Sequence, residues 1–189
     1  MAALIAAARA PDFPAEIALV LSNRSDAGGL ALAKQAGVAT AAVDHKIYAG
    51  RQEFEGSMQA LLDIHRIELI CLAGFMRILS APFVARWRGR MINIHPSLLP
   101  AFRGLNTHAR ALEAGAKIHG CTVHFVEPEL DSGPIIAQAT VAVRDDDTPE
   151  SLGARVLAQE HELYPAALAR IAAGSTTMDR AAIGAETSR

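Results

Sequence analysis

Two side chains that can do chemistry stand two residues apart in the stretch "MINIHPSLLPAFRG", Met91 to Gly104. Asn93 and His95 end an apolar run, directly before a loop that contains two prolines. Because residues i and i+2 of a strand face the same side, an amide and an imidazole would point at one reacting atom. An amide N–H stabilises a carbonyl oxygen that becomes negative, and an imidazole passes protons near neutral pH. The pair therefore suits acyl-type transfer chemistry.

A third group is needed to set the charge of this histidine. Asp131, in the segment "ELDSGP", is the candidate, because a carboxylate beside an imidazolium stabilises the charged form. An Asn and a His at a strand end are, by themselves, more often structural polar groups with satisfied hydrogen bonds. The proline-broken loop and the neighbouring motifs favour the catalytic interpretation.

The elements that must position these residues alternate along the chain. Short apolar runs predict strands at 16–22, 38–43, 67–75 and 90–95, and the segments between them predict helices at 27–36, 50–66 and 80–87. Continuous apolar strands joined by helices are typical of an α/β protein with a Rossmann-like open sheet, mostly parallel in its first half, and helices on both faces. Ligands bind beyond the carboxyl ends of such strands, where "CLAGFMRIL" and "INIHPSLLP" carry their polar residues.

The second half of the chain changes character. Alternating apolar residues predict strands at 121–127 and 134–143, which we expect to be antiparallel. A helix is predicted over 148–173, with Thr148 as its N-cap and Pro149 at the first helical position. We expect one domain over residues 1–174 and a weakly ordered tail over 175–189.

Composition excludes several classes of function. The 18 Lys+Arg and 20 Asp+Glu give a net charge of −2, which predicts no nucleic-acid partner and no acidic membrane surface. No apolar run reaches the length of a membrane span, and the apolar start lacks the basic residues of a signal peptide. Cys71 and Cys121 lie far apart in apolar segments, so we expect free, buried thiols and a cytoplasmic protein.

Three other patterns have alternative interpretations. His95, His108, His119 and His124 lack the i, i+4 spacing of a metal site, so we predict no metal. The glycine-rich segment 26–37 lacks the spacing of a phosphate-binding loop, and it predicts a helix start and end instead. The acidic run 145–147 predicts a solvated turn.

Four segments together resemble a known family: "LAGFMRILS", "NIHPSLLPAFRG", "TVHFV" and "ELDSGPIIAQ". They are similar to the phosphoribosylglycinamide formyltransferases of purine synthesis, and the resemblance extends from the first residues to about Gly174. It implies transfer of the formyl group of 10-formyltetrahydrofolate, the co-substrate, to the amine of glycinamide ribonucleotide. It also implies that Asn93, His95 and Asp131 form the catalytic triad, with no metal and no covalent enzyme intermediate.

The resemblance also assigns the two binding sites. For the folate it implies Arg51, Met76, Arg77, Ile78, Leu79, Asn93, Glu127, Pro128, Glu129, Leu130 and Asp131. For the ribonucleotide it implies Gly74, Ile94, Pro96, Leu157 and Glu160, with Glu160 accepting from ribose hydroxyls. The oligomeric state is left open between monomer and homodimer.

One departure from the family lies at the start of the chain. Family members begin with a strand and a Gly-Ser-Asn-type loop that binds the substrate phosphate at a helix N-terminus. Here "MAALIAAARA" matches the helix that follows that loop. We expect that the start has been placed at an internal methionine. The alternative is a shortened product that lacks a central strand and binds nucleotide weakly.

Rival functions share part of this pattern. Formyltetrahydrofolate hydrolases share the Asn, His and Asp but resemble the chain less and usually carry a regulatory domain in front. Methionyl-tRNA formyltransferases share a similar "SLLPxxRG" stretch but add a basic C-terminal domain, of which this sequence gives no sign. A non-catalytic folate-binding module is the third alternative.

Overall fold

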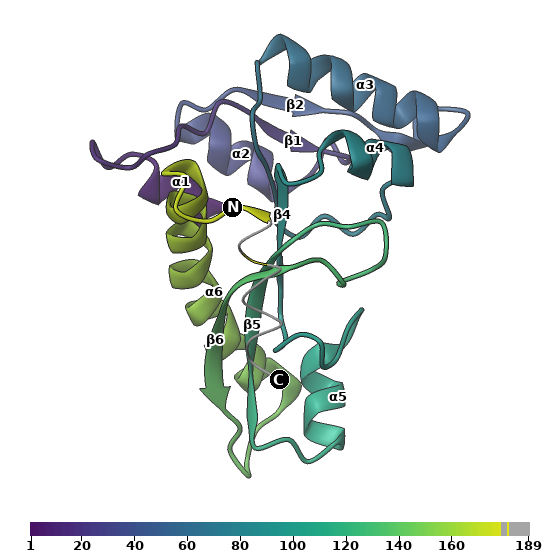
Figure 1. Cartoon of the computed structure of the whole chain (residues 1–189). Helices are drawn as coiled ribbons and strands as arrows, with labels where there is room; N and C mark the ends of the chain where they lie inside the picture. Colours follow the sequence, from purple (N-terminus) through teal and green to yellow (C-terminus); the bar gives the residue numbers. More distant parts are fainter. Residues whose placement is uncertain (179–180, 182–189) are drawn as a thin grey trace.

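The computed structural model describes residues 1–178 and 181, and strands and helices alternate along the chain as predicted (Figure 1). The helices are α1 Ala2–Ala7, α2 Gly28–Gln35, the short 3-10 helix η1 His45–Ile47, α3 Arg51–Ile64, α4 Ala81–Arg86, α5 Thr107–Glu113 and α6 Pro149–Ala172. The strands are β1 Val20–Ser22, β2 Thr40–Ala42, β3 Ile70–Leu72, β4 Met91–His95, β5 Ile118–Phe125 and β6 Ile135–Ala142. The predicted α/β class is confirmed, whereas α5 and η1 were not predicted.

The strands of the described residues form two sheets. Strands β1 and β2 make a parallel pair, and the other four strands have the order β3-β4-β5-β6. Strand β3 is parallel to β4, and the β4-β5 and β5-β6 pairs are antiparallel. The expected change from parallel to antiparallel pairing is therefore confirmed, and it occurs between β4 and β5.

Three predicted strands have only three residues in the structure, and one of them is β2, which was predicted over 38–43 and forms at 40–42. The run predicted over 16–22 is a strand only at 20–22, and the run predicted over 67–75 only at 70–72. Among the described residues, β1 pairs only with β2 and β3 pairs only with β4. A strand with one neighbour makes half of the ladder hydrogen bonds of an interior strand, which explains the shortening.

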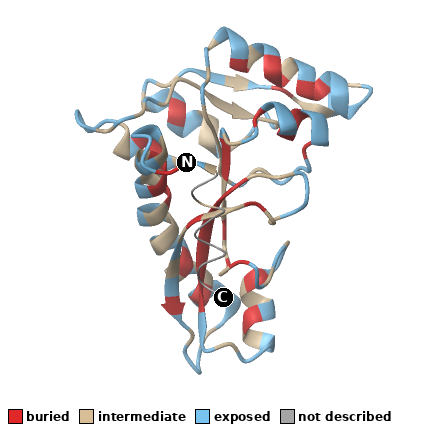
Figure 2. Cartoon of the chain, viewed as in Figure 1, coloured by how far each residue is buried: buried red, intermediate tan, exposed pale blue. Residues whose placement is uncertain are grey.

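The hydrophobic core has two main clusters, on opposite faces of β3 and β4 (Figure 2). Helices α3 and α4 cover the face that contains Ile70, Leu72 and Met91. Helices α1 and α6 cover the opposite face, against which Cys71 and Ile92 pack. The expected helices on both faces of the sheet are thus present.

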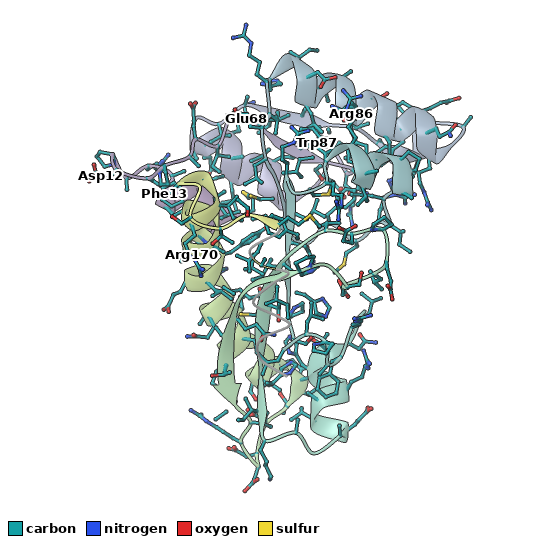
Figure 3. All side chains as sticks on the ribbon, viewed as in Figure 1. Asp12, Phe13, Glu68, Arg86, Trp87 and Arg170 are labelled. Carbon is teal, nitrogen blue, oxygen red and sulfur yellow. The ribbon has the colours of Figure 1, made fainter. Side chains whose placement is uncertain are left out.

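Polar contacts join the two helices of the first face. Trp87, the C-cap of α4, donates from Nε1 to Oε1 of Gln59 in α3 at 2.8 Å (Figure 3). Arg86, also in Figure 3, forms an ion pair of 3.4 Å with Asp63 of α3. This helix pair therefore forms a stable support for the segment 73–80 that precedes α4.

Helix α6 begins as the sequence predicts. Oγ1 of Thr148 accepts from the N–H of Ser151 at 3.2 Å, and the N–H of Thr148 donates to Oγ of Ser151 at 3.0 Å. Pro149 occupies the first turn, where no backbone N–H is needed. The predicted N-cap is confirmed.

The expected weakly ordered tail lies partly outside the described residues, at 179–180 and 182–189. Its first part packs on the domain: Thr176 is buried, and Met178 packs against the core cluster under α6. Both cysteines are free thiols, as expected, with Cys121 buried and Cys71 half-buried. None of the helices in the described part of the chain has the length and apolar character to cross a membrane.

Candidate functional site

Strand β4 places Asn93 and His95 on one face of the sheet. Ile92 and Ile94 pack towards α1 and α6, and Met91 packs towards α3 and α4. By the alternation of a strand, Asn93 and His95 point to the same side as Met91. The predicted common orientation is consistent with this packing, and both residues lie at the carboxyl end of the strand.

His95 meets the carboxylate that the sequence proposes as its partner. Its Nδ1 lies 3.5 Å from Oδ2 of Asp131, and both side chains are less than a tenth exposed. Nε2 lies 3.0 Å from the carbonyl oxygen of Phe102, and because a carbonyl only accepts, Nε2 carries a proton. The imidazole is therefore fixed between a loop carbonyl and a buried carboxylate.

Asn93 contacts a second histidine, His124, which stands in the "TVHFV" motif of β5. Nδ1 of His124 donates to the carbonyl of Phe125 at 2.8 Å, so its Nε2 is free to accept. Nδ2 of Asn93 donates to that Nε2 at 3.3 Å. Burial lowers the pKa of His124, which keeps it neutral and able to accept this bond. His124 thereby orients the Asn93 amide.

Asp131 stands in a tight loop between β5 and β6. Its φ of 49° is left-handed, a conformation that aspartate tolerates better than most residues. Its Oδ2 accepts from the N–H of Gly104 at 2.8 Å. A Cβ at Gly133 would lie 1.8 Å from the carbonyl oxygen of Phe125, so only glycine fits the approach of the loop to β5. The "DSG" sequence is thus required to aim the carboxylate at His95.

The loop after His95 is tied to the antiparallel strands by side chains that the sequence did not single out. Oγ1 of Thr122 donates to the carbonyl of Ser97 at 2.7 Å and accepts from the N–H of Leu99 at 3.0 Å. Nε2 of Gln138 donates to the carbonyl of Leu99 at 2.9 Å. These bonds fix the loop whose Phe102 carbonyl contacts His95. The partners are far apart in sequence, so only the fold identifies them.

Two further histidines, the half-buried His108 and the buried His119, form a pair behind the site. Nδ1 of His108 lies 3.1 Å from Nε2 of His119, and the ring of His119 packs edge-on against Phe102. Burial lowers the pKa of His119 to about 4. Within residues 1–178 and 181, no group of three His, Cys, Asp or Glu side chains has the arrangement of metal ligands.

Comparisons with known proteins place this geometry in a family. A family model described as formyl transferase matches residues 1–168. The chain belongs to the formyl transferase family. Phosphoribosylglycinamide formyltransferase of Escherichia coli (strain K12) is 43% identical over 176 residues, which are 93% of this chain and 83% of that protein.

A longer relative and a solved structure support the same family assignment. The trifunctional purine biosynthetic protein adenosine-3 of Gallus gallus is 50% identical over 179 residues, 95% of this chain but only 18% of that protein. The crystal structure of phosphoribosylglycinamide formyltransferase from Brucella melitensis superposes with a TM-score of 0.88 at 55% identity, over 92% of this chain and 89% of that chain. The Rossmann-like fold is thereby shown together with the family.

In this formyl transferase, the residues that the resemblance assigns to folate lie in two loops and at one helix end, apart from Asn93 on β4. Met76 and Ile78 are 79% and 67% exposed, whereas Leu79 is buried in the core under α3 and α4. The guanidinium of Arg77 lies 5.9 Å from the ring of Phe54, one turn along α3 from Arg51. Leu79 thus fixes the first loop while its neighbours face solvent.

Glu55 fixes the end of the first of these loops, at Ser80. This residue was not identified from the sequence. Its side chain is buried, and Oε1 accepts from the N–H of Ser80 at 2.6 Å, while the Ser80 hydroxyl donates to Oε2. In the second loop, Glu127 pairs with Arg88 at 3.2 Å and Glu129 with Arg103 at 3.4 Å. Pro128 and Leu130, next to these glutamates, are exposed.

The residues assigned to the ribonucleotide come from three elements. Leu72 is in register with Asn93, so Gly74, two residues further along the chain, lies at the edge of the sheet where His95 ends β4. Ile94 and Pro96 flank His95 in the chain and are half-buried. Leu157 and Glu160 lie on α6, where burial raises the pKa of Glu160 and the Met1 amine opposes that shift. No contact brings α6 directly to His95 among those recorded for the described residues.

Proposed function

We propose that this chain transfers the formyl group of 10-formyltetrahydrofolate to the amine of glycinamide ribonucleotide. The observation that carries the proposal is the His95 imidazole between the Phe102 carbonyl and the buried Asp131 carboxylate, beside the amide of Asn93. Similarity to relatives named phosphoribosylglycinamide formyltransferase supports the choice of substrates.

The first step forms a bond between the substrate amine and the formyl carbon. The lone pair of the amine attacks, and the carbonyl π electrons move onto the formyl oxygen, which becomes an oxyanion. Asn93 has a second amide hydrogen that does not point at His124, and it donates to this oxygen. A donor of this kind typically contributes about 2.7–4 kcal/mol to transition-state stabilisation.

His95 supplies the second donor. Its Nε2 proton is bonded to the Phe102 carbonyl, and an oxyanion is a stronger acceptor than a neutral carbonyl. The Asp131 carboxylate lies 3.5 Å from Nδ1, where it orients the ring and offsets positive charge on it. The proton on Nε2 is therefore transferred to or shared with the oxygen as negative charge develops there.

Collapse of the tetrahedral intermediate breaks the bond between the formyl carbon and the folate nitrogen. The oxyanion re-forms the carbonyl, the leaving nitrogen takes a proton, and the attacking amine loses one, so that the proton count is balanced. Asp131 holds the His95 ring in position and helps this proton movement. The folate lies against the two exposed loops at 76–79 and 127–131, and the nucleotide against Gly74, Ile94, Pro96, Leu157 and Glu160.

The test is a transfer assay with purified chain, 10-formyltetrahydrofolate and glycinamide ribonucleotide, followed by detection of the formylated ribonucleotide. We expect turnover in the original chain and a fall in kcat of at least about 10²-fold in His95→Ala, since general acid–base groups contribute roughly 10²–10⁴. An exposed histidine on α6 supplies the matched control, His161→Ala, which should keep normal kcat.

Two results would overturn the proposal. Release of formate at the same rate with and without the ribonucleotide would identify a hydrolase. Binding of the folate without formate release or formyl transfer would identify a binding module.

A further inference from the structure

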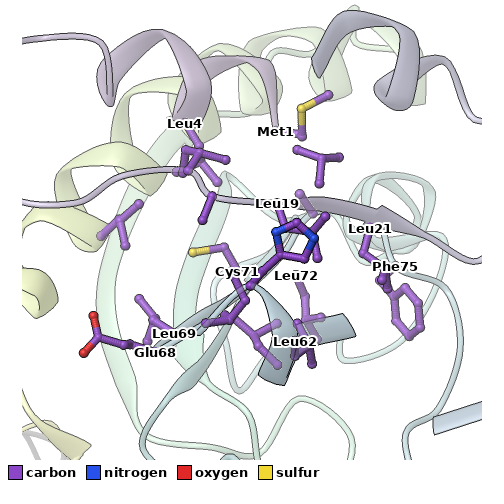
Figure 4. Close-up of a pocket in the computed structure, with 18 of the residues that line it drawn as sticks. Met1, Leu4, Leu19, Leu21, Leu62, Glu68, Leu69, Cys71, Leu72 and Phe75 are labelled. Atoms are coloured by element: carbon purple, nitrogen blue, oxygen red, sulfur yellow. The ribbon is translucent and has the colours of Figure 1, made fainter. Parts of the chain in front are cut away.

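The pair of His95 and Asp131 lies outside the large apolar cavity of the molecule. This cavity, of about 860 Å³ between β1 and β3, is lined by apolar side chains that include Leu19, Leu21 and Leu72 (Figure 4). None of its lining residues lies in the segment 91–131, which the structure describes completely. The cavity therefore does not reach the pair, whose support comes from the loop between β4 and α5.

Two backbone groups of this loop, two residues apart, contact the pair. The carbonyl oxygen of Phe102 lies 3.0 Å from Nε2 of His95, and the N–H of Gly104 donates to Oδ2 of Asp131 at 2.8 Å. A backbone group keeps its direction only while its peptide unit keeps its orientation. The geometry of the pair therefore depends on how the loop 102–105 is held.

Arg110, on α5, holds the peptide unit that contacts Asp131. Its Nη1 donates to the carbonyl oxygen of Arg103 at 2.6 Å, and a weaker contact of 3.4 Å joins the same nitrogen to the carbonyl oxygen of Leu105. The Arg103 carbonyl and the Gly104 N–H belong to one planar peptide unit, so fixing the carbonyl fixes the direction of the N–H. A charged donor on the carbonyl also polarises this unit and strengthens its N–H as a donor. Arg110 is thus linked to Asp131 through a single peptide bond.

Arg110 also contacts the residue that supplies the other backbone group. Cζ of its guanidinium lies over the ring of Phe102, 5.8 Å from the ring centre, where a cation is attracted to the aromatic face. Phe102 has a φ of 55°, in the left-handed region that bulky residues adopt only where surrounding contacts hold them. The edge-on contact with the ring of His119 is a second such contact. Arg110 therefore helps to keep the Phe102 carbonyl directed at His95.

Other contacts of the loop leave these directions less firmly fixed. The Ser97 hydroxyl lies 3.3 Å from the Phe102 carbonyl oxygen but 2.7 Å from that of the preceding residue, and it has one proton to donate. The side chains of Arg103 and Glu129 form an ion pair of 3.4 Å, but both are exposed, and solvent weakens such pairs. Arg110 is exposed as well, yet its bond of 2.6 Å is shorter and reaches the backbone itself.

We propose that Arg110 is a positioning residue, which holds the loop 102–105 in the conformation that directs one backbone group at each member of the pair. Arg110 belongs to neither of the two binding sites proposed above, and it acts only through these backbone groups. The effect on catalysis rests on the proposed function, whereas the effect on the two hydrogen bonds does not. Loss of the guanidinium should therefore lower kcat and leave substrate binding nearly unchanged.

The test is the variant Arg110→Met, which removes the guanidinium but keeps an unbranched side chain suited to a helix. Because Arg110 is exposed, the variant should fold. Two hydrogens report the geometry by NMR, the ring N–H at Nε2 of His95 and the backbone N–H of Gly104, and we expect both to exchange with water about tenfold faster or more in the variant. The ring N–H at Nδ1 of His124 is the internal control and should not change, because it is bonded to the Phe125 carbonyl of β5 instead of to the loop.

Arg170→Met is the matched control variant. Arg170 is an exposed arginine in the last turn of α6, as Arg110 is in the last turn of α5. In the transfer assay we expect kcat of Arg110→Met to fall about tenfold while the KM of each substrate changes less than about twofold, since a misplaced catalytic group costs transition-state stabilisation and not ground-state binding. Arg170→Met should change neither kcat nor the exchange rates.

Unchanged exchange at His95 and Gly104 in Arg110→Met would overturn the proposal, and so would an unchanged kcat in a chain that transfers formyl. Equal acceleration at His124 would also overturn it, because Arg110 would then stabilise the whole site instead of the loop. If the original chain does not transfer formyl while exchange at His95 and Gly104 responds as expected, the proposed function is wrong and the positioning role of Arg110 is supported.

Discussion

At the scale of single residues, a substitution of Asp131 can test the charge of its side chain separately from its size. Asp131→Asn keeps the size of the side chain and an oxygen that can accept from the N–H of Gly104, but it removes the negative charge beside Nδ1 of His95. Because positive charge that develops on the ring during proton transfer is then no longer offset, we expect kcat for formyl transfer to fall by roughly 10²-fold or more. The free energy of unfolding should change little.

The control for this variant is Asp145→Asn, which removes an exposed carboxylate paired only with Lys117. Steady-state kinetics and urea unfolding of both variants check the prediction. Near-normal kcat in Asp131→Asn would show that the carboxylate does not act through its charge.

The sequence predicts residues best where local periodicity decides their orientation. Asn93 and His95 share a face because a strand alternates, and no tertiary information is needed for that. His95 and Asp131 are 36 residues apart in the sequence. Their contact depends on the left-handed backbone of the loop at Asp131, which the sequence pattern does not predict. The contact of His124 with the Asn93 amide follows from the β4-β5 register, in which the two residues lie opposite each other.

At the scale of elements, the loop between β5 and β6 is the most sensitive to added volume. In Gly133→Ala the new Cβ would meet the Phe125 carbonyl oxygen at 1.8 Å, so backbone must shift. We expect a loss of about 1–3 kcal/mol in the free energy of unfolding, as is typical of overpacking, together with a displaced Asp131 and lower kcat. Gly56→Ala is the matched control, because nothing lies within 4 Å of its Cβ in the middle of α3.

Urea denaturation and the transfer assay together test the loop prediction. Gly56→Ala should stabilise the chain by about 0.5–1 kcal/mol, since alanine favours the helix interior. The prediction is wrong if Gly133→Ala has the same free energy of unfolding and the same kcat as the original chain. The close approach of the loop to β5 would then not be what positions Asp131.

Element boundaries were predictable where an element carries its own signals. Thr148 and Pro149 fix the start of α6 to one residue, and β4 differs from its predicted range by one residue. Strands β1 and β3 were predicted several residues too long, because a strand's extent depends on its neighbours as well as on its composition. Helix α5 was missed since its start at Thr107 follows a residue in left-handed conformation, Asn106, instead of a side-chain cap.

At the scale of the whole molecule, three histidines that are buried or half-buried should couple the fold to pH. Burial lowers the pKa of His108, His119 and His124 below the ordinary value near 6.5, and that of His119 to about 4. In the unfolded chain these groups bind protons near pH 6.5, so below that pH the unfolded state binds more protons than the folded state. Their contribution to stability is therefore complete above about pH 6.5 and is lost progressively as the pH falls towards about 4.

We expect the free energy of unfolding, measured with urea, to fall between about pH 7 and pH 5, with His119 contributing at most about 1.4 kcal/mol per pH unit below pH 6.5. Asp147, whose pKa is lowered by Arg155, acts only at more acidic pH and does not contribute in this window. His119→Leu removes one of the three groups, so the slope should decrease even if stability at neutral pH also changes. His161→Gln, at an exposed position of α6, should leave the slope unchanged. A flat profile in the original chain, or an identical slope in His119→Leu, would mean that these histidines become protonated without opening the core behind the site.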